Sequence, residues 1–271
     1  MSHPQKTPIK ALIVDMDGVL WRQSQPIGDL TRIFQKIEAK GLKITLATNN
    51  ATLTVEQYLQ KLASFGVELL PEQIVNSPQA AAMYMVRHFQ PGSTLFVIGK
   101  DGLRQEMLKH GYVIADGKGD AAVAAVVVGM DWDLSFEQLC QATLFLRAGA
   151  AFIATNGDRT FPTPQGLVPG VGAILALLET ASEKKPIIVG KPDPLMYQIA
   201  LDRMQVSPSE CLVVGDRLET DILGGQQLGC QTALVLSGVS TLQQAQAWSP
   251  PPDRICQDFE EVIDQLEAHD G

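Results

Sequence analysis

The amino-acid sequence predicts an α/β fold: a doubly wound parallel sheet with a second α/β domain inserted into it. Two observations lead to this prediction. Short β-branched apolar runs alternate with amphipathic helical segments, and this order implies right-handed crossovers between parallel strands. A stretch of about 100 residues in the middle of the chain, a usual domain size, repeats the alternation by itself. A chain of 271 residues is long enough to bury a core in both parts.

The first outer segment begins the predicted sheet. Residues Lys10–Asp15 form a short apolar run that ends at polar residues, which is typical of a buried strand. Residues Leu30–Lys40 follow with apolar side chains at helical spacing, and Gly41 ends this predicted helix. A second strand is predicted at Leu42–Thr48 and a second amphipathic helix at Val55–Phe65. This order places both strands in one parallel sheet.

The rest of the chain supplies the inserted domain and the second half of the sheet. The inserted segment has predicted strands at Thr94–Ile98, Ala122–Val128 and Ala151–Thr155, and predicted helices at Leu103–Lys109, Phe136–Ala148 and Ala173–Ala181. The second outer segment has predicted strands at 211–215 and 231–236, and predicted helices at 219–229 and 259–266. We therefore expect a core of residues 1–81 and 185–271 and an inserted domain of residues 82–184.

Composition and charge exclude several classes of protein. Hydrophobic residues make up 45% and charged residues 19%, as in an ordinary globular protein. The net charge of −9, without a cluster of Lys or Arg, argues against a nucleic-acid or membrane partner. Four widely spaced cysteines argue against a disulfide framework or a zinc site. The N-terminus lacks an apolar leader and the longest apolar run, 121–128, is too short to span a bilayer, so we predict a cytoplasmic protein.

Carboxylates gather at two of the predicted strand ends, where parallel sheets bind ligands. Asp15 and Asp17 lie two residues apart after the first strand, so regular strand geometry would point both side chains to one face. Asp216 and Asp221 follow the strand at 211–215. Clustered carboxylates repel one another unless a hard cation joins them, and Mg²⁺ suits an all-oxygen site shared with a substrate phosphate. These four residues therefore predict a magnesium site.

Hydrogen-bond donors and one cation complete the set. Thr48 ends the second strand, and its hydroxyl and the amides that follow it, at Asn49 and Asn50, can donate to phosphate oxygens. Lys191 lies between Gly190 and Pro192 and supplies a positive point charge. An acidic nucleophile, a neighbouring acid or base, Mg²⁺ and a lysine together describe phosphoryl transfer through an aspartyl phosphate.

Each of these residues also has a plainer interpretation when it is taken alone. A D-x-D pair is often a solvated turn, Lys191 a surface lysine, and Asp221 a charge that favours the first turn of a helix. Asn49 or Asn50 is expected to cap the next helix as well. Asn156, in the polar loop after a predicted strand of the inserted domain, either faces the active site or braces the domain junction.

The motifs in this order resemble the haloacid dehalogenase superfamily of phosphatases. They are Asp15-x-Asp17-Gly18-Val19, the Thr48 strand end, Lys191, and Gly215-Asp216-x4-Asp221. The inserted segment resembles the C2-type α/β cap of subclass IIA, which includes p-nitrophenyl, phosphoglycolate and pyridoxal phosphatases and NagD-type nucleotide phosphatases. It does so at residues 153–158, 169–173 and 190–192. The resemblance spans nearly the whole chain and implies a Rossmann-like core with an inserted cap.

The resemblance also implies a role for each motif residue. Asp15 would be the nucleophile and a Mg²⁺ ligand. Asp17 would be the general acid and then the general base, with its backbone carbonyl on Mg²⁺. Thr48, Asn49 and Asn50 would hold the phosphate, and Lys191 would neutralise it. Asp216 would bind Mg²⁺ and Asp221 would support the water shell of the metal.

The implied function is Mg²⁺-dependent hydrolysis of small phosphorylated metabolites. Two alternatives stay open: a phosphotransferase or mutase on the same core, and a catalytically silent binding module. A nicotinamide dehydrogenase is the weakest alternative, because Gly170-Val171-Gly172 has neither a strand leading into it nor the third glycine. The sequence leaves phosphoglycolate, pyridoxal phosphate, nucleoside monophosphates and sugar phosphates open as substrates. A homodimer through the cap is implied by the resemblance alone.

Overall fold

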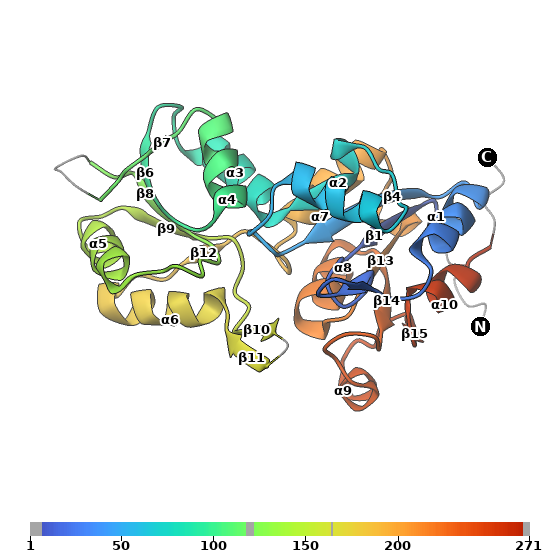
Figure 1. Ribbon diagram of the computed structural model, residues 1–271. Coiled ribbons are helices and arrows are strands. Elements are labelled where there is room, and N and C mark those ends of the chain that lie inside the picture. Colours follow the sequence, from blue (N-terminus) through green and yellow to red (C-terminus); the bar gives the residue numbers. More distant parts are fainter. Residues whose placement is uncertain (1–6, 118–121, 164, 268–271) are drawn as a thin grey trace. The chain divides into compact units, whose positions relative to one another are not determined.

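The computed structural model describes residues 7–117, 122–163 and 165–267 (Figure 1). The chain forms two compact units. The core unit comprises residues 1–48, 59–75 and 197–271, and the cap unit comprises residues 49–58 and 76–196. The boundaries expected from the sequence, at 82 and 184, lie inside the cap unit, which also takes the short segment directly after Thr48.

The core unit is built on a six-stranded sheet with the strand order β15-β14-β13-β1-β4-β5. Its strands are β1 (Ala11–Val14), β4 (Lys43–Thr48), β5 (Ile74–Asn76), β13 (Cys211–Gly215), β14 (Gln231–Val235) and β15 (Arg254–Cys256). All four residues of β1 are buried, and Val14 is aligned in parallel with Val214 of β13 and Leu46 of β4. After β1, the chain first adds β4 and β5 on one side of β1, and it later adds β13, β14 and β15 on the other side. The carboxyl ends of β1, β4 and β13 therefore meet where ligands bind in such sheets.

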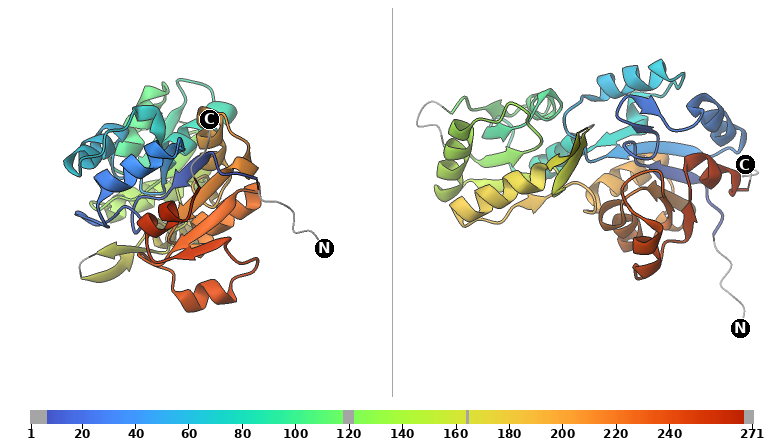
Figure 2. Two further views of the ribbon diagram at one scale, coloured as in Figure 1. Left: turned by 90° about the vertical axis from the view of Figure 1, so that its right-hand side faces the viewer. Right: turned by 60° about the horizontal axis from the view of Figure 1, so that its bottom comes forward.

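Helices lie on both faces of this sheet (Figure 2). The helices that lie wholly or mostly in this unit are α1 (Leu30–Ala39), α2 (Val55–Ser64), α7 (Leu195–Met204), α8 (Leu223–Leu228), α9 (Leu242–Ala247) and α10 (Phe259–Asp264). In α1, Leu30, Ile33 and Ile37 are buried on one face, as their spacing predicts. A short hairpin of β2 (Trp21–Arg22) and β3 (Gln25–Pro26) follows β1.

The cap unit has a five-stranded sheet with the order β12-β9-β8-β6-β7. Its strands are β6 (Thr94–Ile98), β7 (Val113–Ile114), β8 (Ala125–Val128), β9 (Ala151–Ala154) and β12 (Ile187–Ile188), and a separate hairpin joins β10 (Thr160–Thr163) to β11 (Gly166–Pro169). Its helices are α3 (Ser77–His88), α4 (Asp101–Lys109), α5 (Phe136–Arg147) and α6 (Val171–Ser182). Apolar residues of β6, β8, β9, α5 and α6 form its core.

The predicted fold class is confirmed, with differences in single elements. The helix expected at 219–229 begins instead as a π-helical turn at Leu218–Ile222, and α8 follows it. The backbone N–H of Arg217, the residue before this turn, donates to the Asp221 carboxylate at 3.1 Å. The side chain of Asp221 therefore accepts a hydrogen bond from the backbone at the start of its own turn. Helices α3 and α9, strands β5, β7, β12 and β15 and the two hairpins were not predicted. None of the helices in the described residues combines the length and the apolar composition of a membrane span. All four cysteines are free thiols.

Candidate active site

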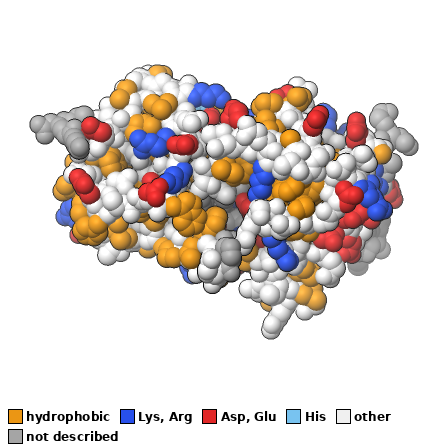
Figure 3. All heavy atoms as spheres, viewed as in Figure 1, with side chains coloured by type: hydrophobic (Ala, Val, Ile, Leu, Met, Phe, Trp, Pro, Cys, Tyr) orange, Lys and Arg blue, Asp and Glu red, His pale blue; other side chains and the backbone are white. Residues whose placement is uncertain are grey.

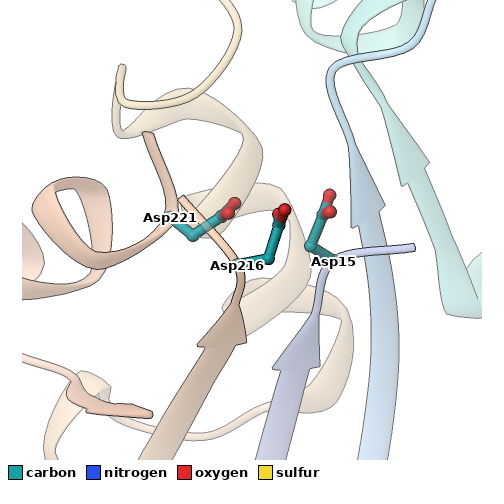
Figure 4. A group of neighbouring side chains, drawn as sticks. All are labelled: Asp15, Asp216 and Asp221. Carbon is teal, nitrogen blue, oxygen red and sulfur yellow. The ribbon is translucent and has the colours of Figure 1, made fainter. Parts of the chain in front are cut away.

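Three carboxylates meet at the carboxyl edge of the core sheet (Figure 4). Asp15 directly follows β1, Asp216 directly follows the neighbouring β13, and Asp221 lies in the π-helical turn after it. One oxygen of each lies within 4.8 Å of the others, and the residues are only 9%, 2% and 2% exposed. Negative charges this close together and this far from water are costly unless a cation balances them. The oxygen-only donor set fits a hard divalent cation.

The backbone around Asp216 and Asp221 holds these carboxylates in place. The N–H of Val239 donates to Asp216 Oδ2 at 2.7 Å, and the N–H of Ser240 donates to the Asp216 carbonyl at 3.0 Å. A Cβ atom at Gly215 would collide with the side chain of Asp221, so only glycine allows this turn to close against the strand. The positions of Asp216 and Asp221 are therefore fixed by loops that follow β13 and β14.

The turn after Asp15 brings Asp17 back toward the β2–β3 hairpin. Gly18 has a φ of +90°, and a Cβ atom there would strike the Asp216 carboxylate, so this turn also requires glycine. The N–H of Gly18 donates to the Trp21 carbonyl at 2.8 Å. The indole Nε1–H of Trp21 donates to Asp17 Oδ1, also at 2.8 Å. The half-buried Asp17 carboxylate is thus held by a fully buried tryptophan.

The hairpin is itself tied to the rest of the site. Arg22 Nε donates to the Ser237 carbonyl at 2.7 Å, and the Ser237 hydroxyl donates to the Gly18 carbonyl at 2.7 Å. Lys61 places its ammonium group 4.0 Å from the centroid of the Trp21 ring. Burial lowers the pKa of Lys61 from its ordinary value, while the negative charge of Asp17 opposes this shift. A cation therefore lies close to both Trp21 and Asp17.

Thr48 is the last residue of β4 and is 2% exposed. Because β4 pairs with β1 and Leu46 is aligned with Val14, Thr48 ends its strand beside the residues that follow β1. Asp15, Asp216 and Asp221 thus lie together at the carboxyl edge of the core sheet. Thr48 lies at the same edge, at the end of the neighbouring strand β4.

Lys191, Asn49 and Asn50 lie in the cap unit. Lys191 is 3% exposed, so it is not a surface lysine. The side-chain amide of Asn49 binds its backbone on both sides: Nδ2 donates to the Lys191 carbonyl at 3.0 Å, and Oδ1 accepts from the Lys191 N–H at 2.8 Å. Asn156 in turn donates to the carbonyl of Asn49 at 2.9 Å, so within this unit it braces the segment after Thr48.

The expectation that Asn49 or Asn50 caps the next helix is wrong. The hydroxyl of Thr54 accepts from the N–H of Gln57 at the start of α2, while Asn50 Oδ1 accepts from the N–H and the hydroxyl of Thr52. By contrast, Asp193 Oδ1 accepts from the N–H of Leu195, the first residue of α7, at 3.0 Å. The catalytic and binding roles given to the eight motif residues stay predictions.

Sequence reasoning missed Trp21, Arg22 and Lys61. The signal for Trp21 was present, because it follows Asp17 by four residues and a short hairpin returns it to that position. Arg22 and Lys61 carried no comparable signal, since their partners depend on how distant segments fold together.

Comparisons with known proteins show the family of this chain. The family description "haloacid dehalogenase-like hydrolase" matches residues 12–113, and "HAD-hydrolase-like" matches residues 188–262. An acid sugar phosphatase of Staphylococcus aureus is 36% identical over 258 residues, which are 95% of this chain and 98% of the relative.

Two solved structures are similar over almost all of this chain. A p-nitrophenyl phosphatase from Archaeoglobus fulgidus has a TM-score of 0.88 and 31% identity, with 96% of this chain and 100% of that one covered. A glycerol phosphate phosphatase from Mycobacterium tuberculosis, solved with magnesium, has a TM-score of 0.88 and 31% identity, with 95% of this chain and 77% of that one covered. The chain therefore belongs to the haloacid dehalogenase-like hydrolases, and within them to the phosphatases with an inserted α/β cap.

Proposed function

We propose that this phosphatase hydrolyses phosphate monoesters of small metabolites through an aspartyl phosphate on Asp15. The observation that carries the proposal is the cluster of Asp15, Asp216 and Asp221, whose carboxylate oxygens lie within 4.8 Å of one another. A buried acidic cluster repels a phosphate dianion, so the same site needs a cation before it can bind its substrate.

Mg²⁺ is the cation that suits this set of ligands. Asp15, Asp216 and the backbone carbonyl of Asp17 would hold it, and Asp221 would support its water shell. When bound, the metal would neutralise the cluster and draw electron density from the phosphate oxygens. The glycerol phosphate phosphatase with the same fold, solved with magnesium, supports this choice.

The first half of the reaction transfers the phosphoryl group to the protein. A carboxylate oxygen of Asp15 attacks phosphorus while the bond from phosphorus to the ester oxygen breaks. Asp17 gives its proton to that oxygen, so the product leaves as an alcohol. The result is an aspartyl phosphate on Asp15 and a carboxylate on Asp17.

The second half restores the enzyme. Asp17 takes a proton from water as the water oxygen attacks phosphorus, and the bond to the Asp15 carboxylate breaks. Inorganic phosphate leaves, and Asp17 is again protonated. Thr48 and the backbone amides after it would hold the phosphate oxygens, while the Lys191 ammonium would balance their charge. The amide of Asn49 is engaged with Lys191, so its contribution to phosphate binding would be to position that lysine.

The substrate class is a small phosphate monoester. Relatives that act on sugar, glycerol and nitrophenyl phosphates point to a phosphate on a compact organic group. The test is steady-state hydrolysis of p-nitrophenyl phosphate and glycerol phosphate with Mg²⁺, by the wild type and by Asp15→Asn. We expect phosphate release by the wild type alone. A folded wild type without turnover would favour a silent binding module, and phosphate passed to an added alcohol instead of water would favour a phosphotransferase.

A further inference from the structure

The indole group of Trp21 is placed to control one side chain, Asp17. Trp21 is fully buried, and its N–H is the single polar group of its side chain. A buried indole N–H needs an acceptor. Here that acceptor is Oδ1 of Asp17, at 2.8 Å. Trp21, the donor of this hydrogen bond, thus lies outside the motifs, four positions after Asp17.

The indole ring has little freedom to move. Lys61 lies over its face with Nζ 4.0 Å from the ring centroid, and the same Nζ donates to the Gln23 carbonyl at 2.8 Å. The Phe65 ring lies against Trp21 with a distance of 6.0 Å between ring centroids. The backbone of Trp21 accepts from the N–H of Gly18 at 2.8 Å. Asp17 is therefore bound by a donor that is itself fixed from several sides.

We propose that Trp21 is the positioning residue of the general acid: its N–H holds one oxygen of the Asp17 carboxyl group and leaves the other to face the leaving group. The inference rests on the proposed function, in which Asp17 protonates the ester oxygen. An oxygen that accepts from an indole N–H does not at the same time carry the acid proton toward that donor. In the proposed reaction, the second oxygen carries the proton that Asp17 gives, because it is the one that must reach the ester oxygen.

Such control matters because general acid catalysis depends on geometry. The acid must lie within hydrogen-bond reach of the atom it protonates. An aspartate on a turn can rotate about two side-chain bonds, and each unproductive orientation lowers the fraction of encounters in which transfer succeeds. A fixed hydrogen bond to one oxygen removes most of these orientations.

The experiment uses two substrates that differ in their need for a proton. p-Nitrophenolate is a stable anion and leaves without protonation, whereas the alkoxide of glycerol phosphate requires it. kcat/KM reports the steps up to release of the alcohol, so it isolates the first half-reaction from the second. The enzyme is the full chain with Mg²⁺.

Two variants remove the donor. Trp21→Phe removes the indole N–H and part of the ring. Replacement of Trp21 by benzothienylalanine keeps the bicyclic shape and puts sulfur where the N–H was, so it tests the hydrogen bond even if Trp21→Phe folds poorly. Phe259→Leu is the matched control, since Phe259 is a fully buried aromatic residue of the same unit in α10, the helix that follows the edge strand β15.

We expect both Trp21 variants to lose about tenfold or more in kcat/KM for glycerol phosphate and less than about twofold for p-nitrophenyl phosphate, since general acid catalysis is worth roughly 100-fold or more. Phe259→Leu should lower the melting temperature but change kcat/KM by the same factor for both substrates. An equal loss on both substrates, or no loss, for the benzothienylalanine protein would overturn the inference and leave Trp21 a core residue.

Asp17→Asn separates this inference from the proposed function. If Asp17→Asn loses much more activity on glycerol phosphate than on p-nitrophenyl phosphate while the Trp21 variants do not, Asp17 is the acid and the role of Trp21 is wrong. If Asp17→Asn affects both substrates equally, the acid role of Asp17 fails, and the inference about Trp21 fails with it.

Discussion

The side-chain amide of Asn49 forms a two-point hydrogen bond with the backbone of Lys191. It donates to the Lys191 carbonyl at 3.0 Å and accepts from the Lys191 N–H at 2.8 Å, although the two residues are 142 positions apart. Asn49 is itself held through its carbonyl, which accepts from the Ser77 hydroxyl at 2.8 Å and from Asn156 at 2.9 Å. Asn49, which directly follows β4, thus fixes the backbone of Lys191, the lysine that we expect to balance the charge of the phosphate.

Asn49→Ala should therefore impair catalysis through Lys191. We expect kcat/KM to fall by about tenfold on both glycerol phosphate and p-nitrophenyl phosphate, since the lysine acts on the phosphate rather than on the leaving group. Loss of two buried hydrogen bonds should lower the free energy of unfolding by about 2 kcal/mol. Asn76→Ala is the control, because Asn76 is a buried asparagine that caps α3 in the same unit. This substitution should lower the free energy of unfolding by about 1 kcal/mol and leave the activity unchanged. Equal kcat/KM values for Asn49→Ala and Asn76→Ala would contradict the proposal that Asn49 positions Lys191.

Asp216→Asn should weaken the metal site, because it removes a charge from a site with few charged ligands. We expect the Mg²⁺ concentration for half-maximal activity to rise by about tenfold or more. EDTA should inactivate the wild type, and added Mg²⁺ should restore it. Asp258→Asn, at the N-cap of α10, should leave the Mg²⁺ requirement unchanged. Full activity of the wild type in EDTA would rule out the metal assignment.

Glu210 should make the core unit sensitive to acid. A hydrogen bond from Lys10, whose Nζ lies 2.6 Å from its carboxylate, and hydrogen bonds from Ser207 lower the pKa of Glu210 to about 2. A carboxyl group with a lowered pKa in the folded state stabilises the protein above its ordinary pKa, and that stability is lost as the pH falls toward 2. Melting temperatures of the wild type should therefore fall more between pH 5 and pH 2.5 than those of Glu210→Gln. Parallel curves would show that this ion pair does not contribute.

The predicted homodimer through the cap can be tested at α5. Phe136 and Leu144 lie on one side of this helix and are 77% and 60% exposed, and orange side chains gather over α5 and α6 in Figure 3. If this face is covered in a dimer, Phe136→Ser with Leu144→Ser should give a folded monomer in sedimentation measurements. A wild type that sediments as a monomer at high concentration would end the dimer hypothesis.

Much of the fold could be predicted because it depends on local patterns. The buried run of β1, the spacing of Leu30, Ile33 and Ile37, and the carboxylates at two strand ends are all visible in short windows of sequence. The sheet topology then brings Asp15 and Asp216 together without further information.

The missed features depend on long-range contacts or on ambiguous chemistry. An asparagine beside a phosphate site and one that holds a backbone look alike in sequence, so the partner of Asn49 became visible only in the fold. The bond from Arg22 to Ser237 joins residues 215 positions apart, and no local pattern indicates it. Strand β12 has only two residues, Ile187–Ile188, which is too short for a periodic signal.

The proposed mechanism requires Asp15 to carry the phosphoryl group during turnover. The most direct measurement is acid quenching of the enzyme with Mg²⁺ and p-nitrophenyl phosphate, reduction of the acyl phosphate with borohydride, and peptide mass spectrometry. We expect that Asp15 alone is reduced, as homoserine, and that Asp15→Asn gives no labelled peptide. A phosphoryl group found on another aspartate, on a serine or on a histidine would contradict it.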